Sequence, residues 1–151
     1  ATNDISIERE TDQAVRLSVT LDGVSMPVYS GDGLLIGTPA GSTGYTLAAG
    51  GTPIDHRASC FILTPNNPQH SAQFANIIIP LVLARETKVE IKVREARKRP
   101  VRVSIDGRGR RSVKAVRAYL DPHEKATLLW LPNWNYFRQV STKIFGLKKR
   151  R

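Results

Sequence analysis

Residues 31–51 read GDGLLIGTPAGSTGYTLAAGG, and the rest of the chain is best interpreted outward from this stretch. It begins with a predicted turn at Gly31–Gly33, continues as an apolar strand at Leu34–Ile36, and then enters a corner rich in Gly, Ser and Thr. A short helical piece, Tyr45–Ala49, follows and ends at Gly50–Gly51. A strand that leads through small residues into a helix start exposes backbone N–H groups to a ligand. The spacing matches neither common nucleotide-binding glycine loop, so these residues alone predict a binding corner of unspecified ligand.

The composition is typical of one globular domain. The chain has 151 residues, 40% of them hydrophobic and 24% charged, which is enough to bury a core. No apolar run approaches the roughly 20 residues of a membrane span, so we expect no membrane segment. The single cysteine, Cys60, excludes an internal disulfide and fits a reducing, cytoplasmic location. The three histidines are scattered and form no zinc spacing with it, so no metal site is expected.

The chain is strongly basic, with a formal net charge of +10. Basic residues cluster at 94–102, 108–111 and 148–151, a pattern that favours anionic partners such as nucleic acid, phosphorylated small molecules or membrane headgroups. Solvated turns and a charged terminus are the more common explanation of each cluster. Aromatic residues make up only 7% and are not interleaved with the basic clusters, so the stacking platform of a nucleic-acid-binding surface is not indicated. A basic β domain that binds nucleic acid remains an alternative.

Most of the chain is predicted to form short strands. Alternating or continuously apolar segments predict about ten of them, at residues 5–7, 17–21, 24–28, 34–36, 61–63, 77–79 with 81–83, 89–93, 101–105, 113–120 and 127–131. Residues 64–69 are interpreted as an irregular loop whose amide side chains could hydrogen-bond the edge of a base or a carboxamide. Short strands separated by turn signals favour an all-β fold, a multi-stranded antiparallel β-sandwich that spans residues 1–151 as one domain. Besides the helix after the Gly-rich corner, a C-terminal helical segment containing Phe137, Val140 and Phe145 is expected to pack on the core.

Three Asp-Gly pairs are candidates for turns or for polar positions at the rim of a site. Asp22–Gly23 predicts a two-residue hairpin turn between flanking strands. Asp32–Gly33 and Asp106–Gly107 can be turns or ligand contacts, because a carboxylate there can accept bonds from amide or hydroxyl donors. His70 and Ser71 have no third orienting partner in the sequence, so nucleophilic catalysis is not indicated.

Taken in order, these segments resemble the NAD kinase family, whose signature reads DG…TPTGSTAY…SAGG. The matching residues here are Asp32–Gly33, TPAGSTGY at Thr38–Tyr45 and AGG at Ala49–Gly51. Three further pieces resemble the family's Asn-Glu/Asp, L-T-P-x-x-P-H-S and S-x-D-G-Q motifs: Asn3–Ile5, Leu63–Pro65 with His70–Ser71 one residue further along, and Ser104–Gly107. The related lipid kinases are a second alternative, but the TPxGSTxY motif favours the NAD kinases over them.

The resemblance implies a C-terminal β-sandwich domain that binds much of the NAD. The whole enzyme is expected to transfer the ATP γ-phosphoryl group to the 2′-hydroxyl of the adenosine ribose of NAD, with Mg²⁺, and to form homodimers or homotetramers. By motif, Asn3 and Asp4 hold the adenosine, and Asp106 lies near the reacting ribose as a candidate catalytic residue. Asp32, often supplied across a subunit interface, receives the nicotinamide end. The adenine side is lined by Thr43, Gly44, Tyr45 and Ala48.

Several departures from the family pattern bear on activity. No GGDG loop occurs in the sequence. From the resemblance we therefore expect that these residues do not include the family's N-terminal α/β domain, which carries that loop and an aspartate near the reacting hydroxyl. We therefore expect this chain to bind NAD or NADP without catalysing transfer. Gly44 replaces an alanine, Ala48 replaces a serine, and Arg108 replaces the glutamine after Asp-Gly.

Overall fold

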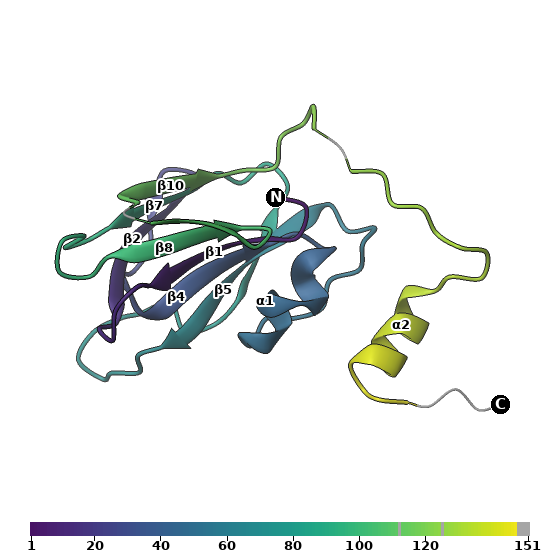
Figure 1. Cartoon of the computed structure of the whole chain (residues 1–151), viewed down its shortest axis with the longest axis horizontal. Helices are drawn as coiled ribbons and strands as arrows, with labels where there is room; N and C mark the ends of the chain where they lie inside the picture. Colours follow the sequence, from purple (N-terminus) through teal and green to yellow (C-terminus); the bar gives the residue numbers. More distant parts are fainter. Residues whose placement is uncertain (112, 125, 148–151) are drawn as a thin grey trace.

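The structure, a computed structural model, describes residues 1–111, 113–124 and 126–147 and is built mainly of antiparallel strands (Figure 1). A 3-10 turn η1, Gly41–Thr43, and a short helix α1, Tyr45–Ala48, follow the fourth strand, and helix α2, Tyr136–Lys143, lies near the C-terminus. The strands are β1 Asp4–Arg9, β2 Val15–Leu21, β3 Val24–Ser25, β4 Tyr29–Gly37, β5 Cys60–Pro68, β6 Leu81–Ala84, β7 Val89–Val93, β8 Val101–Ile105, β9 Arg108–Arg111 and β10 Ala115–Ala118.

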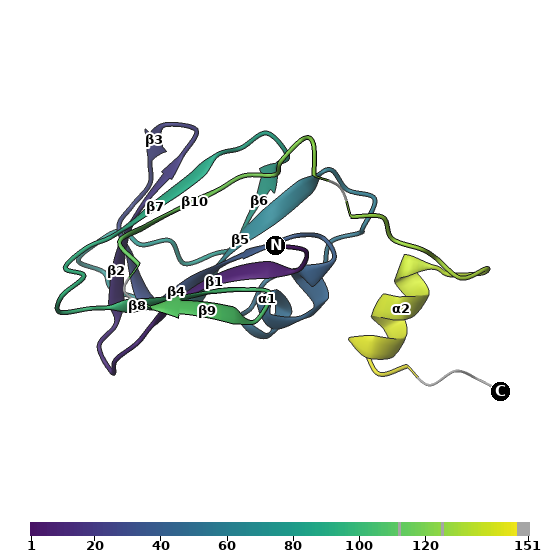
Figure 2. The same cartoon turned by 45° about the horizontal axis from the view of Figure 1, so that its top comes forward.

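Strand β4 organises the sheet because three strands pair with it. β1 and β2 follow one another along one edge, with Asp4 opposite Gly37 and Val15 opposite Gly31. β5 occupies the other edge from Gly31 to Gly37 and carries β6 beyond it. β8 and β9 extend the sheet from β1, whereas β7 and β10 extend it from β2. The two branches diverge, and the sheet curls into two facing layers (Figures 1 and 2).

The hydrophobic core lies between these layers. Alternation along each strand sends apolar side chains inward, as in β2, where Val15, Leu17 and Val19 are at most 1% exposed. The other core side chains come from both branches and include Ile7, Leu34, Ile36, Phe61, Leu63, Val89, Ile91, Val101 and Val103. The predicted all-β antiparallel fold is confirmed, with the detail that its layers are parts of one continuous curled sheet.

Two of the three Asp-Gly pairs form turns. Asp22 and Gly23 have φ of 47° and 82° between β2 and β3, so the predicted hairpin turn is confirmed. Asp106 and Gly107, with φ of 45° and 80°, form the same kind of turn between β8 and β9. The turn predicted at Gly31–Gly33 is wrong, because Asp32 lies inside β4, which begins at Tyr29.

Other boundaries also differ from the sequence prediction. Residues 64–68, predicted as a loop, continue β5, because Thr64 to Asn66 and Pro68 pair with β4 despite their two prolines. The stretches 77–79 and 127–131, predicted as strands, are not strands in the structure. Most of their apolar side chains are exposed: Ile79 is 62% and Leu129 91% exposed.

The helix after the Gly-rich corner is confirmed and ends before Gly50, which has a φ of +90°. The C-terminal helix also exists, with the Asn135 side chain accepting a bond from the Arg138 N–H at its start. Its expected packing on the core is wrong: Phe137 and Phe145 are 66% and 71% exposed, and α2 stands apart from the sheet in both views (Figures 1 and 2). Among the described residues, no helix is long and apolar enough to cross a membrane.

Candidate functional site

The turn that carries Asp106 holds the first residues of the chain through their backbone. Asp106 Oδ2 accepts a bond from the Thr2 N–H at 2.7 Å, and Oδ1 accepts from the N–H groups of Asn3 and Asp4 at 2.8 and 3.2 Å. From the other side, Thr38 Oγ1 donates to the Thr2 carbonyl at 2.6 Å, and the Thr38 N–H donates to the Asn3 carbonyl at 2.9 Å. The entry to β1 is therefore fixed between the end of β4 and the β8–β9 turn.

The Gly-rich corner packs directly on this entry. A Cβ added at Gly41 would lie 2.1 Å from the Asn3 carbonyl oxygen, so only glycine allows this approach. Behind it, the buried Ser42 Oγ accepts a bond from the Ile54 N–H at 2.8 Å and donates to the Pro39 carbonyl at 2.7 Å. These bonds fix the corner from which η1 and α1 begin.

The side chains of Asn3 and Asp4 remain available for a ligand. Among the described residues, neither has a hydrogen-bond partner, because the contacts above use only their backbone. Burial, with the nearby Asp106 and Glu8 carboxylates, raises the pKa of Asp4. Burial also acts to raise the pKa of Asp106, but its three N–H donors and the N-terminal amine outweigh that effect and lower it. Asp106 is thus kept as an anion beside Asp4.

Tyr45, the first residue of α1, points along the sheet toward Glu8. Its hydroxyl donates to Glu8 Oε1 and accepts a bond from Asn66 Nδ2 at 3.3 Å. Burial and the hydrogen bond with Glu8 raise the pKa of Tyr45 to about 12. The second carboxylate oxygen of Glu8 accepts from Ser6 Oγ at 3.0 Å and lies 3.6 Å from an Arg102 guanidinium nitrogen.

These groups share one surface, which we call the polar face: Asp4, Ser6 and Glu8 of β1 with Arg102 of β8, Asn66 of β5 and Tyr45 of α1. Alternation in β1 sends Ile5 and Ile7 to the core side and the polar residues to the other. Sequence reasoning missed Ser6, Glu8 and Arg102 as site residues. The alternation of residues 4–9 was the signal that could have found the first two.

The remaining predicted site residues fall into two places. Thr43 is half-buried in η1, and Gly44 and Ala48 are exposed on the same corner as Tyr45. Asp32 lies elsewhere: its carboxylate pairs with Arg9 Nε at 2.8 Å and accepts a bond from Asn67 Nδ2 at 3.0 Å. Five residues of extended chain separate it from Gly37, which pairs with Asp4, a distance of roughly 16 Å. The structure brings Asn3, Asp4 and Asp106 together but places Asp32 near the middle of β4, away from the Gly37 end where Asp4 pairs.

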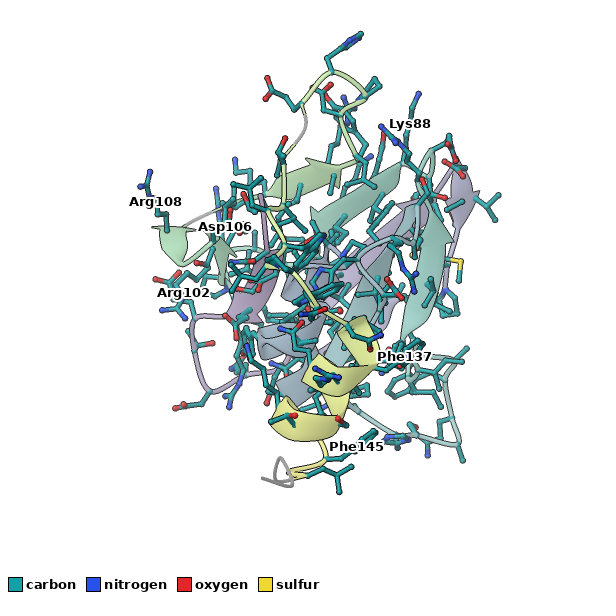
Figure 3. The ribbon with its side chains drawn as sticks, turned by 90° about the vertical axis from the view of Figure 1, so that its right-hand side faces the viewer. Lys88, Arg102, Asp106, Arg108, Phe137 and Phe145 are labelled. Atoms are coloured by element: carbon teal, nitrogen blue, oxygen red, sulfur yellow. The ribbon has the colours of Figure 1, made fainter. Side chains whose placement is uncertain are left out.

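A cavity of about 720 Å³ opens beside the Asp106 end of the site. Its lining includes Thr38, Pro39 and Asp106, together with His56, Arg57 and residues of the segment after β10. In Figure 3, Arg102 and Asp106 lie on the same side of the molecule, with Arg108 projecting outward. Within the described ranges, no group of three His, Cys, Asp or Glu side chains could hold a metal ion.

The chain matches a known family. The family model described as the ATP-NAD kinase C-terminal domain matches residues 2–119. The NAD kinase of Rhizorhabdus wittichii is 35% identical over 148 residues, 97% of this chain and 56% of that protein. The NAD kinase of Brucella suis is 31% identical over 146 residues, 96% of this chain and 55% of that protein.

Solved structures show the same fold. Yeast NADH kinase in complex with NADH aligns with a TM-score of 0.71 and 22% identity, covering 99% of this chain and 42% of that one. An NAD kinase from Archaeoglobus fulgidus in complex with ATP aligns with a TM-score of 0.65 and 23% identity, covering 98% and 55%. The chain spans about half the length of the curated relatives it matches. Because the family model matches residues 2–119, most of the sequence, the chain belongs to the family of ATP-NAD kinase C-terminal domains.

Proposed function

We propose that this chain is the NAD-binding part of an NAD kinase. The complete kinase would transfer the γ-phosphoryl group of ATP to the 2′-hydroxyl of the adenosine ribose of NAD and release NADP. This chain would supply the dinucleotide-binding surface. The remaining length of its relatives, together with the GGDG loop that the sequence lacks, would supply most of the phosphate-donor site.

The observation that carries the proposal is the clamp on the entry to β1. Asp106 and Thr38 bind the backbone of residues 2–4 and leave the side chains of Asn3 and Asp4 without partners among the described residues. An amide offers both donors and acceptors, and a carboxylate offers acceptors, so the pair suits ribose hydroxyls and the edge of a base. Tyr45 adds an aromatic surface beside them, where an adenine or nicotinamide ring could lie.

ATP and Mg²⁺ belong to the proposal for the complete enzyme. Both carboxylate oxygens of Asp106 already accept backbone N–H bonds, so this aspartate suits a structural and electrostatic role better than metal binding. Mg²⁺ is typically bound through substrate phosphates and one or two carboxylates. In phosphoryl transfer the metal would neutralise the developing charge on the phosphate oxygens. Asp106 would place Asn3 and Asp4 against the reacting ribose.

A homodimer or homotetramer would complete the nicotinamide end. Asp32 is partly exposed, at 32% of its side chain, and lies too far from Asp4 to meet the same end of one dinucleotide. In the proposed oligomer it would receive the carboxamide of an NAD bound mainly by a neighbouring copy. The proposed location is the cytoplasm, where the lone Cys60 thiol stays reduced.

Isothermal titration calorimetry with NAD and NADP tests the proposal. We expect saturable binding by the wild-type chain, strong weakening in the Asn3→Ala, Asp32→Ala double variant, and no NADP production from NAD and ATP by this chain alone. Glu90→Ala is a matched control, because it removes a carboxylate from an ion pair with Arg117 on the β7–β10 branch. Equal heats from wild type and the double variant would refute the site. Tight, salt-sensitive binding of single-stranded DNA without NAD competition would instead support a nucleic-acid-binding function.

A further inference from the structure

We propose that Glu8 is a positioning residue for Tyr45, and that its carboxylate holds the tyrosine ring as one wall of the dinucleotide site. This inference rests on the proposed NAD binding. Glu8 lies outside every motif that identifies the family in this sequence, and the assignment comes from the contacts of its two carboxylate oxygens.

The orientation of the Tyr45 side chain depends on contacts outside helix α1, because the helix itself is too short to fix it. α1 contains four residues, and a helix of that length has no independent stability. The side chain of Tyr45 stands at its first position, and the residue is 41% exposed, so core packing does not fix the ring. The contacts of its hydroxyl with Glu8 and Asn66 are the hydrogen bonds that the described residues offer it.

Glu8 is a well-fixed acceptor for that hydroxyl. It lies in β1, which is paired on both sides, to β4 and to β8, and its side chain is only 17% exposed. Ser6 Oγ donates to Oε2 at 3.0 Å and Arg102 approaches the same oxygen at 3.6 Å, which leaves Oε1 for Tyr45. A hydrogen bond to an ionised, pre-oriented carboxylate is stronger than one between neutral groups. The carboxylate thus sets the direction of the tyrosine side chain.

The arrangement also decides which part of Tyr45 can meet a ligand. The hydroxyl donates a hydrogen bond to Glu8 and accepts a second hydrogen bond from Asn66, so its hydrogen-bonding capacity is largely used. The faces of the ring remain as the contact surface. A neutral ring held in one orientation suits stacking against, or an edge contact with, the flat ring of a nucleotide base. With its pKa raised to about 12, the phenol stays neutral at physiological pH.

Calorimetry with NAD on Glu8 and Tyr45 variants tests this role. Glu8→Ala is expected to weaken NAD binding about tenfold, the size of losing one charged hydrogen bond. Glu8→Gln keeps an acceptor oxygen and is expected to recover most of the affinity. Glu90→Ala, which removes a strand carboxylate paired with Arg117 at 3.4 Å, should leave NAD affinity unchanged. Circular dichroism confirms that each variant is folded.

A double-mutant comparison separates positioning from a general effect of charge. In a Tyr45→Phe background the hydroxyl is already gone, so adding Glu8→Ala should cause no further loss. Equal losses in both backgrounds, or a loss from Glu8→Ala no larger than that from Glu90→Ala, would overturn the proposal. If Glu8→Ala does not fold, Tyr45→Phe alone must reproduce the weakening, since it removes the same bond from the other side; wild-type affinity in Tyr45→Phe would overturn it.

The free protein gives a readout that does not depend on NAD. With ¹³C-labelled tyrosine rings, Glu8→Ala should shift and broaden the Tyr45 signals and leave those of Tyr136 unchanged, because the Tyr136 ring packs against His56. A wild-type chain that binds no NAD would refute the proposed function, whereas unchanged Tyr45 signals in Glu8→Ala would refute the positioning role itself.

Discussion

Asp106 and Asp22 occupy the same kind of turn and make different contacts. Both are the first residue of an Asp-Gly hairpin turn, with φ of 45° and 47°. Asp22 accepts one backbone bond, from the Lys88 N–H at 2.7 Å. Asp106 accepts three, all from the segment that presents Asn3 and Asp4. The turn sequence alone gives no indication of this difference, because it arises from a segment more than 100 residues away.

This contrast predicts different outcomes for two matched substitutions. Asp106→Ala should lower the free energy of unfolding by about 1 kcal/mol. This is a small loss for three hydrogen bonds, because the site is exposed and water can replace the carboxylate. The same substitution should strongly weaken NAD binding. Asp22→Ala should lower stability by a similar or smaller amount and leave NAD affinity unchanged. Urea denaturation and calorimetry measure the two effects. Wild-type NAD affinity in Asp106→Ala would show that the clamp is not needed for the site.

Asp4 and Asp106 have pKa shifts of opposite sign, and therefore opposite effects on stability. A lowered pKa at Asp106 contributes stability above the ordinary carboxyl pKa of 3.8, and this is lost as the pH falls through the lowered value. The raised pKa of Asp4 lowers the free energy of unfolding when the pH is above that pKa, because the folded protein must then hold an unfavourable charge. This destabilisation disappears below pH 3.8, where the carboxyl is protonated in both the folded and the unfolded protein. Asp4 is thus kept ionised at a cost, as expected of a ligand-binding carboxylate.

Removing the Asp4 charge should therefore stabilise the protein while it damages the site. Asp4→Asn is expected to raise the free energy of unfolding at pH 7 by on the order of 0.5 kcal/mol, the usual size for a substitution outside the core. The gain should vanish near pH 3, where the wild-type carboxyl is protonated. Melting temperatures at the two pH values provide the measurement. A gain that persists unchanged at pH 3 would contradict a charge-based cost.

At the scale of elements, the Gly-rich corner works by close packing on the entry to β1. Gly41→Ala would place a Cβ 2.1 Å from the Asn3 carbonyl oxygen and 2.5 Å from its carbon, so the backbone must move. We expect a loss of about 1–3 kcal/mol of stability and a loss of NAD binding. Gly109→Ala is the control, because its Cβ would make ordinary van der Waals contacts, at 3.7 Å with the Arg102 side chain and at 3.9 Å with the Val103 carbonyl oxygen. Unchanged stability in Gly41→Ala would argue against this packing.

After Leu120, the described part of the chain leads away from the sheet (Figure 1). This segment meets the loop after α1 through His56, whose ring lies 5.2 Å from Trp130 and 5.9 Å from Tyr136. Several of its large apolar side chains are exposed, including Leu129 at 91% and Leu131 at 81%. Exposed apolar side chains gathered in one segment usually meet a partner surface or promote self-association.

Truncation after Asp121 should therefore leave the sheet folded. Leu120, which packs against the core, is kept, and the family model already ends at residue 119. We expect a single cooperative unfolding transition with a melting temperature within about 5 °C of that of the full chain, equivalent to roughly 1 kcal/mol. Size-exclusion chromatography should show less self-association. A truncated chain without a cooperative transition would show that the segment is part of the folding unit.

The sequence was most informative where local chemistry decides the structure. Alternation predicted β2, β7 and β8, and Asp22–Gly23 predicted its hairpin, because side-chain period and turn conformation are properties of a few adjacent residues. It failed at residues 64–68, where pairing with β4 overrides two prolines, and at 77–79 and 127–131, where apolar residues lie exposed. Tertiary pairing and the surfaces of partners are not encoded in local periodicity.

At the scale of the whole molecule, the site joins four separate parts of the chain. Motif resemblance named Asn3, Asp4, Tyr45 and Asp106, and the fold brings three of them together at one end of β4. Glu8 and Arg102 were not predicted as site residues, because each looks like an ordinary surface residue until the register pairs them beside Tyr45. The separation of Asp32 from Asp4 likewise depends on the length of β4, which the predicted turn had shortened.

The central claim is that this chain binds NAD on the polar face, beside the clamped entry to β1. The most direct measurement is an NAD titration of the ¹⁵N-labelled chain followed by NMR. We predict saturable shifts in the amides of residues 2–8, 41–46, 66–67 and 106–107, with β7 and β10 unaffected. Absence of saturable shifts, or shifts confined to the β7–β10 branch, would contradict the account.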